Sequence, residues 1–79
     1  MATGDDVREL AAQTIADLHA IKGWKKAELL LEYRPHTKRW TITVWRTKAE
    51  QTEEIYLRSH PDHGPDIICV LAIAHAKES

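Results

Sequence analysis

The residue types best suited to chemistry gather in the last third of the chain, at His60, Asp62, His63, Asp66, Cys69 and His75. Imidazole nitrogens at the spacing of His60 and His63 can bind one metal ion, and Asp66 or Cys69 could add a third ligand. Cys69 and His75, however, would point in different directions from a helix. A turn rich in His, Pro, Asp and Gly also needs no metal to explain it. We therefore predict no metal site.

The sequence also argues against catalysis. A nucleophilic Cys69 would have to be exposed and activated by a base such as His63 or His75. It lies instead between Ile68 and Val70, where burial would keep the thiol inert. The three glycines form no phosphate-binding pattern, and a chain of 79 residues can hardly enclose a deep pocket. We predict no catalytic residue, no cofactor and no enzymatic activity.

The composition indicates one domain, residues 1–79, with a small core. Cys69 is the only cysteine, which excludes a disulfide within the chain and fits a reducing compartment. The net charge is -1, so the strong positive field of a typical nucleic-acid binder is missing. The acidic N-terminus does not resemble a signal peptide, and the longest apolar run is far shorter than the ~20 residues that span a bilayer. We expect a cytoplasmic protein.

The stretch DDVRELAAQTIADLHAIKGW predicts an amphipathic helix with both ends marked. Asp6 and Glu9 have the spacing of a capping box at its start. Gly23 suits the left-handed residue that ends a helix, and Trp24 can fold back onto the last turn near Leu18. The apolar stripe follows a spacing of three and four and consists of Val7, Leu10, Ala11, Thr14, Leu18 and Ile21.

Three strands follow, within residues 27–34, 39–47 and 53–59, because apolar and polar residues alternate there. With Arg34 opposite Arg39, the large apolar residues of the first two strands share one face. On the other face we expect Leu30 opposite Thr43 and Trp45 opposite Tyr56. Residues 48–52 form the second turn. In the third strand we expect Ile55 and Leu57 to point inward, and Glu54, Tyr56 and Arg58 outward.

The final run begins at Pro65 and is apolar at eight consecutive positions, 67–74. Its β-branched residues favour a strand, whereas its length, Pro65 and its alanine-rich end favour a helix, which we prefer. The predicted fold is then a small α+β domain in the order α-β-β-β-α. Its three-stranded antiparallel meander has both helices packed on one face.

Such a helix has more apolar surface than one sheet and one helix can cover. We therefore expect a homodimer in which a second copy covers Ile68, Cys69, Ile73 and Ala76. The alternative is that the helix lies centrally, between the first helix and the sheet, and is covered within one chain.

The sheet face without helices suggests a second contact. It would present Leu30, Trp45, Tyr56 and Arg58, and Trp and Tyr are common anchors of protein interfaces. The alternative is that these residues only stabilise an exposed sheet. We predict a small non-enzymatic protein-binding module that engages a larger protein through this face or associates with itself. Regulators, adaptors and inhibitors encoded by phages or mobile elements are proteins of this kind.

A nucleic-acid-binding function is the alternative. The hairpin between the first two strands carries Arg34, His36, Lys38 and Arg39. The α-β-β-β-α order resembles that of the double-stranded RNA-binding domain, in element order only, which implies a nucleic-acid-binding domain that would use this basic hairpin. That family has a lysine cluster at the start of its last helix, whereas this chain has Gly64, Pro65, Asp66 and Ile67 there. Carboxylates at this position would repel phosphate.

Overall fold

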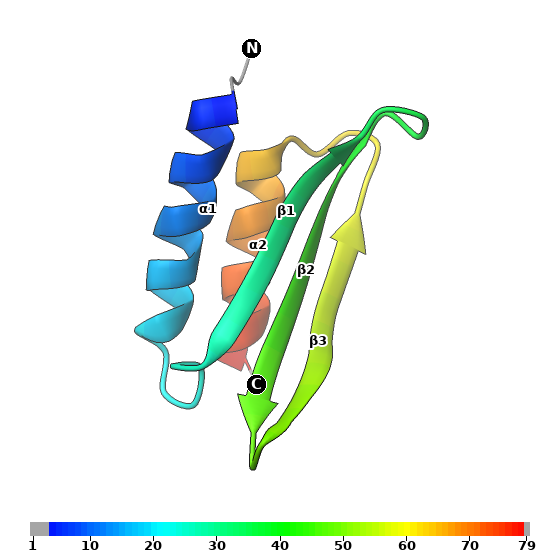
Figure 1. Cartoon of the computed structure of the whole chain (residues 1–79). Coiled ribbons are helices and arrows are strands. Elements are labelled where there is room, and N and C mark those ends of the chain that lie inside the picture. The colour runs from blue at the N-terminus through cyan, green and yellow to red at the C-terminus, as the bar shows by residue number, and fades with distance from the viewer. Residues whose placement is uncertain (1–3, 79) are drawn as a thin grey trace.

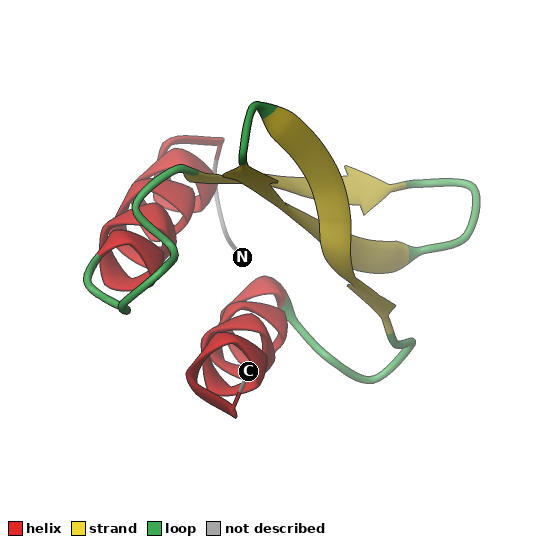
Figure 2. Ribbon diagram, turned by 90° about the horizontal axis from the view of Figure 1, so that it is seen from below, coloured by secondary structure: helices red, strands yellow, loops and turns green. Residues whose placement is uncertain are grey.

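The computed structural model describes residues 4–78, and these form two helices and three strands. The elements are α1 (Gly4–His19), β1 (Ala27–Arg34), β2 (Arg39–Lys48), β3 (Gln51–Ser59) and α2 (Pro65–Glu78). The strands form one antiparallel sheet in the order β1-β2-β3 (Figure 1). Both helices lie on the same side of it, as Figure 2 shows. The predicted α+β class, element order and meander are confirmed.

α1 packs on β1, and α2 packs on β2, on β3 and on α1. One face of the sheet is therefore covered and the other carries no helix (Figure 2). Neither α1 nor α2, which are the helices of residues 4–78, has the length and apolarity needed to cross a membrane.

α1 begins before the predicted capping box and ends before the predicted glycine. Asp6 lies within the helix, because the chain is already helical from Gly4, so the assignment of Asp6 as its cap is wrong. Beyond His19 the chain continues in turns, and Gly23 adopts a φ of 88°, the left-handed conformation expected of it. Trp24 then returns to the core, where it is almost completely buried.

Two further contacts hold the connection between α1 and the sheet. The ring nitrogen Nε2 of His19 lies 2.9 Å from the carbonyl oxygen of Ala27, at the start of β1. The guanidinium carbon of Arg46 lies 4.6 Å from the centroid of the Trp24 ring, within the range of a cation–π interaction. The first contact ties the end of α1 to β1, and the second ties the connection after α1 to β2.

β1 and β2 pair in the predicted register, with Arg34 opposite Arg39 and Leu31 opposite Ile42. A shift by one residue would move the apolar side chains of one strand to the other face of the sheet. The alternation of apolar and polar residues therefore excludes the shifted registers. Ile42 and Val44 of this central strand are buried beneath the helices.

The turn between β2 and β3 is shorter than predicted. It consists of Ala49 and Glu50, whose φ angles are 54° and 65°, and Lys48 pairs with Gln51 on either side. Two consecutive left-handed residues are typical of a type I′ turn, which matches the twist of a hairpin. Asn and Gly are the usual residues of such a turn. Because neither occurs at positions 49 and 50, the sequence did not predict it.

β3 contains a β-bulge that the alternation pattern does not reveal. Val44 pairs with Tyr56, whereas the next residue, Trp45, pairs with Glu54, so Ile55 is an extra residue on β3. Ile55 and Tyr56 both pack against the core. The predicted pairing of Trp45 with Tyr56 is therefore wrong.

α2 completes the core from the end of the chain, and its helical conformation agrees with our preferred prediction. Its buried residues are Ile68, Cys69, Ala72 and Ala76, and Ile73 packs against them. α2 contacts α1, β2 and β3, so its buried stripe is covered within one chain, as in the alternative that we considered, but α2 lies beside α1 and not between α1 and the sheet (Figure 2). Ile68, Cys69 and Ala76 are thus covered within the chain and, contrary to our expectation, are not available to a second copy.

Replacing Ile68 by Ala should lower the free energy of unfolding by about 2–5 kcal/mol, because the fully buried side chain leaves a cavity. Val70 is 68% exposed, so Val70→Ala should change it by less than about 0.5 kcal/mol. Urea unfolding followed by tryptophan fluorescence measures both. Equal losses would show that α2 is rotated relative to this structure.

Replacing Ala49 by Asn and Glu50 by Gly should raise the free energy of unfolding by about 1 kcal/mol, because these residues adopt positive φ more readily. The control is Thr37→Gly in the other hairpin, which should lower stability because Gly loses more entropy on folding. Urea unfolding of both variants checks this. A destabilised double variant would contradict the type I′ turn.

Candidate functional site

The chemistry-bearing residues of the last third are dispersed in the structure. The rings of His60 and His63 stack with centroids 4.1 Å apart, and the backbone N–H of Asp62 donates to Nδ1 of His60 at 3.2 Å. His75 lies on α2, with its ring 4.8 Å from that of Tyr56. Across residues 4–78, no group of three or more His, Cys, Asp or Glu side chains is placed to hold a metal ion. The histidines contribute packing contacts in two separate places.

Cys69 is buried where α2 faces α1. Burial raises the pKa of its thiol above the ordinary value, a hydrogen bond with Thr14 lowers this pKa in part, and the charge of Asp66 raises it. A raised pKa keeps the thiol protonated at neutral pH, whereas the nucleophilic form is the thiolate. The geometry therefore offers no activated nucleophile at Cys69.

The sheet face opposite the helices is called here the outer face. Its central row crosses all three strands and consists of Leu30, Thr43 and Leu57. Leu30 is 46% exposed and Leu57 is 56% exposed, whereas Thr43 between them is buried. The two leucines therefore shield the central strand and remain open to solvent themselves.

The next row of the outer face adds an aromatic ring between two carboxylates. Trp45 is half-buried, and it pairs with Glu28 on one side and Glu54 on the other. Both glutamates are exposed. Leu30, Trp45 and Leu57, called here the outer-face patch, thus form an apolar surface with an acidic border.

Two of the four predicted protein-binding residues lie elsewhere. Leu30 and Trp45 are on the outer face as expected. Tyr56 and Arg58 pair with Val44 and Ile42 of the core, and directly paired residues share a face, so both point to the helix side. The cause is the bulge at Ile55, which reverses the alternation of β3.

Leu57 is the outer-face residue that the sequence prediction missed. Simple alternation from Ile55 places Leu57 inward, whereas the bulge turns it outward. A two-residue turn at positions 49–50 would have set the register only as far as Glu54 opposite Trp45, and no sequence signal marks the bulge that follows it.

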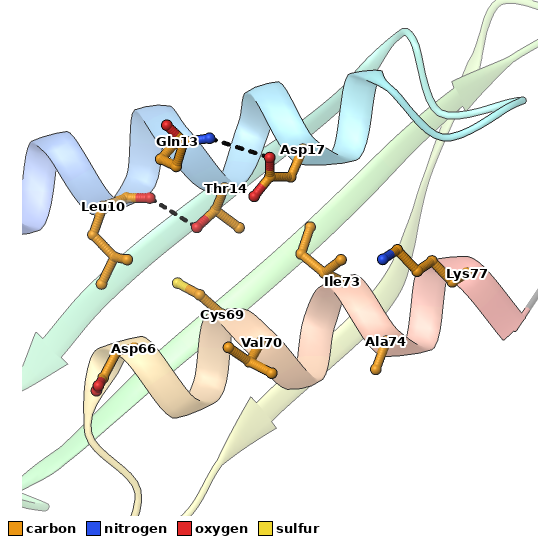
Figure 3. Close-up of a pocket in the computed structure, with 10 residues that line it drawn as sticks. All are labelled: Leu10, Gln13, Thr14, Asp17, Asp66, Cys69, Val70, Ile73, Ala74 and Lys77. Carbon is orange, nitrogen blue, oxygen red and sulfur yellow. Dashed lines mark hydrogen bonds between the residues drawn. The ribbon is translucent and has the colours of Figure 1, made fainter.

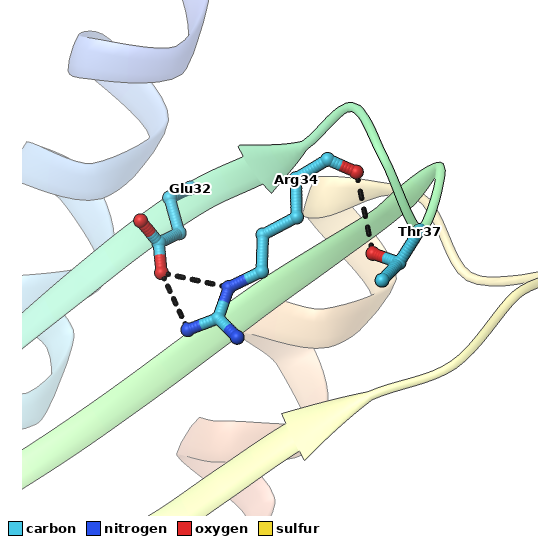
Figure 4. Close-up of polar contacts among 3 residues, drawn as sticks. All are labelled: Glu32, Arg34 and Thr37. Atoms are coloured by element: carbon cyan, nitrogen blue, oxygen red, sulfur yellow. Dashed lines mark hydrogen bonds and ion pairs between the residues drawn. The ribbon is translucent and has the colours of Figure 1, made fainter.

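The four residues predicted for nucleic-acid contact, Arg34, His36, Lys38 and Arg39, are all exposed near the tip of the β1–β2 hairpin. Arg34 is ion-paired, because its Nη2 and Nε donate to one carboxylate oxygen of Glu32 at 2.9 and 3.1 Å (Figure 4). The start of α2 lies at the same end of the molecule (Figure 1), and it carries the carboxylate of Asp66. The opposing charges reduce the positive field at this end.

A groove of about 370 Å³ runs between α1 and α2 (Figure 3). Its α2 wall consists of Asp66, Cys69, Val70, Ile73, Ala74 and Lys77. Val70 at 68% and Ile67 at 45% are the large apolar residues of α2 that remain exposed. The uncovered part of α2 is therefore not the stripe that we predicted.

Comparison with protein-family models, with curated proteins and with solved structures found no match to this chain.

The raised pKa of Cys69 predicts that stability falls at alkaline pH. An unfolded thiol ionises near pH 8.5, whereas the raised pKa of the buried thiol delays its ionisation to higher pH, so unfolding becomes more favourable as pH rises above about 8.5. Urea unfolding at neutral pH and at about pH 9.5 measures the loss. Cys69→Ala is the control, and it should remove this part of the pH dependence. An equal loss in the control would contradict the assignment to Cys69.

Proposed function

We propose that this protein is a small non-enzymatic binding module that attaches to a larger protein through the outer-face patch. The observation that carries the proposal is the exposure of Leu30 and Leu57, at 46% and 56%, on a sheet face that neither helix covers. A regulator, an adaptor or an inhibitor would use such a surface.

Burial of the patch against a partner would release a favourable free energy. Fully covering a leucine side chain contributes about 1.5–3 kcal/mol, and the patch has two leucines beside a tryptophan. Tryptophan is one of the residues most often found at energetic hot spots of interfaces. The patch is also rigid, because Leu30, Trp45 and Leu57 stand on paired strands. Little backbone entropy is therefore lost on binding.

The charges around the patch indicate the kind of partner surface that fits. Glu28 and Glu54 lie on either side of Trp45, and both are exposed. A partner that offers an apolar depression bordered by lysine or arginine would pair with these carboxylates. We also propose a reducing compartment such as the cytoplasm, because Cys69 is a buried free thiol.

Binding of nucleic acid through the β1–β2 hairpin is the second candidate function. The exposure of His36, Lys38 and Arg39 at the hairpin tip favours it. The carboxylate of Glu32 on Arg34 and that of Asp66 at the same end oppose it. Counterion release distinguishes the two functions, because phosphate contacts weaken steeply with salt and an apolar protein interface changes little.

Affinity capture from the native host tests the protein-binding function. The variant Leu30→Glu with Leu57→Glu should lose at least about 90% of the captured partner, because two carboxylates replace the apolar centre of the patch. The matched control is Ile67→Glu with Val70→Glu, which makes the same change on α2 and should retain the partner. Circular dichroism confirms that both variants fold.

Two results would contradict the proposed function. Undiminished capture by the Leu30 and Leu57 variant would remove the outer-face patch as the site. The second candidate would be established instead if the protein captured nucleic acid, and if this capture was lost both at high salt and in the variant Lys38→Glu with Arg39→Glu.

A further inference from the structure

α2 carries a self-complementary stripe on the side that the core leaves exposed. Asp66, Val70, Ile73 and Lys77 follow one another at intervals of four, three and four residues, so they lie along one line of the helix. Figure 3 shows all four lining the groove beside α1. The stripe is apolar in its middle and has charges of opposite sign at its two ends.

The apolar middle of the stripe is broader than the line itself. Val70 is 68% exposed and Ile67 is 45% exposed, and together with the exposed Ala74 they widen the apolar surface. Ile73 is half-buried at the edge of the core. The small side chain of Ala74 leaves room for another helix to approach closely.

We propose that a second copy of this chain covers the stripe, with the two α2 helices packed antiparallel about a twofold axis. The axis passes between residues 71 and 72, so Asp66 of each copy lies next to Lys77 of the other. Val70 of each copy then packs against Ile73 and Ala74 of the other. A twofold contact of this kind uses the same patch on both molecules and closes on itself.

The charges select this orientation. A parallel pair would bring Asp66 against Asp66 and Lys77 against Lys77, whereas the antiparallel pair makes two contacts of opposite sign. Asp17 of α1 also lines the groove, near Lys77, and accepts a hydrogen bond from Gln13 at 3.1 Å (Figure 3). Its carboxylate adds negative charge on the α1 side of the groove.

The proposed contact is small. A helix of 14 residues is about 21 Å long, and one helix pair with the neighbouring residues of α1 lies at the lower end of stable interfaces. We therefore expect a monomer–dimer equilibrium at micromolar concentrations. The proposal does not depend on the proposed function, because α2 and the outer face lie on opposite sides of the sheet (Figure 2).

Sedimentation velocity over a range of concentrations, from micromolar to submillimolar, tests the dimer. The wild type should shift from monomer to dimer, and Val70→Glu should remain a monomer throughout, because two carboxylates would meet near the axis. Leu57→Glu is the matched control, since it changes an exposed residue on the outer face and should dimerise as the wild type does. A wild type that stays monomeric, or a Val70→Glu variant that dimerises normally, would overturn the proposal.

Charge reversal tests the antiparallel orientation. Asp66→Lys and Lys77→Glu should each weaken the dimer about tenfold, because each places two like-charge contacts in it. The double variant restores opposite charges and should return to within about threefold of the wild type. In a parallel pair the single variants would dimerise as tightly as the wild type, and this result would overturn the antiparallel orientation. A double variant that dimerises no more tightly than the single variants would overturn it as well. Circular dichroism verifies that each variant folds.

Discussion

The rest of the structure depends on the packing of α2 against α1 and the sheet. A three-stranded sheet and one helix form a shallow layer, and α2 supplies Ile68, Cys69, Ala72 and Ala76 to the core that this layer encloses. Small residues at three of these positions let α2 approach α1 and the sheet closely. One narrow stripe of α2 is therefore enough to cover the core. The opposite side of the same apolar helix is left in solvent, because nothing in residues 4–78 covers it.

The position of α2 beside α1, on the same face of the sheet, also explains why the outer face is uncovered. With both helices on one side, the sheet must present its other side to solvent or to another molecule (Figure 2). On this uncovered side the central strand carries the threonines Thr41 and Thr43, which neighbouring side chains bury. Leu30 and Leu57 on the flanking strands remain exposed to solvent. The molecule thus has two separate apolar surfaces, one on each side of the sheet.

Much of the fold followed from residue pattern, and the errors have identifiable causes. Alternation set the register of β1 and β2 because both strands have regular pleats and a clear apolar face. It failed in β3, where the extra residue Ile55 reverses the faces and no glycine marks the turn at Ala49 and Glu50. For α2, the length of the run, Pro65 and the alanine-rich end favoured a helix, but an apolar residue at every position of 67–74 did not tell which stripe would be buried. Only the packing against α1 and β2 determines that.

The bulge in β3 has a consequence for how the molecule behaves in a crowded solution. β3 is an edge strand, and an unbroken edge offers a row of N–H and C=O groups on which another chain can add as a strand. At Ile55 the row is interrupted and the strand bends, and the charged side chains of Glu53 and Glu54 lie next to the irregularity. The bulge that turns Leu57 outward therefore disfavours the addition of another strand at the β3 edge of the sheet.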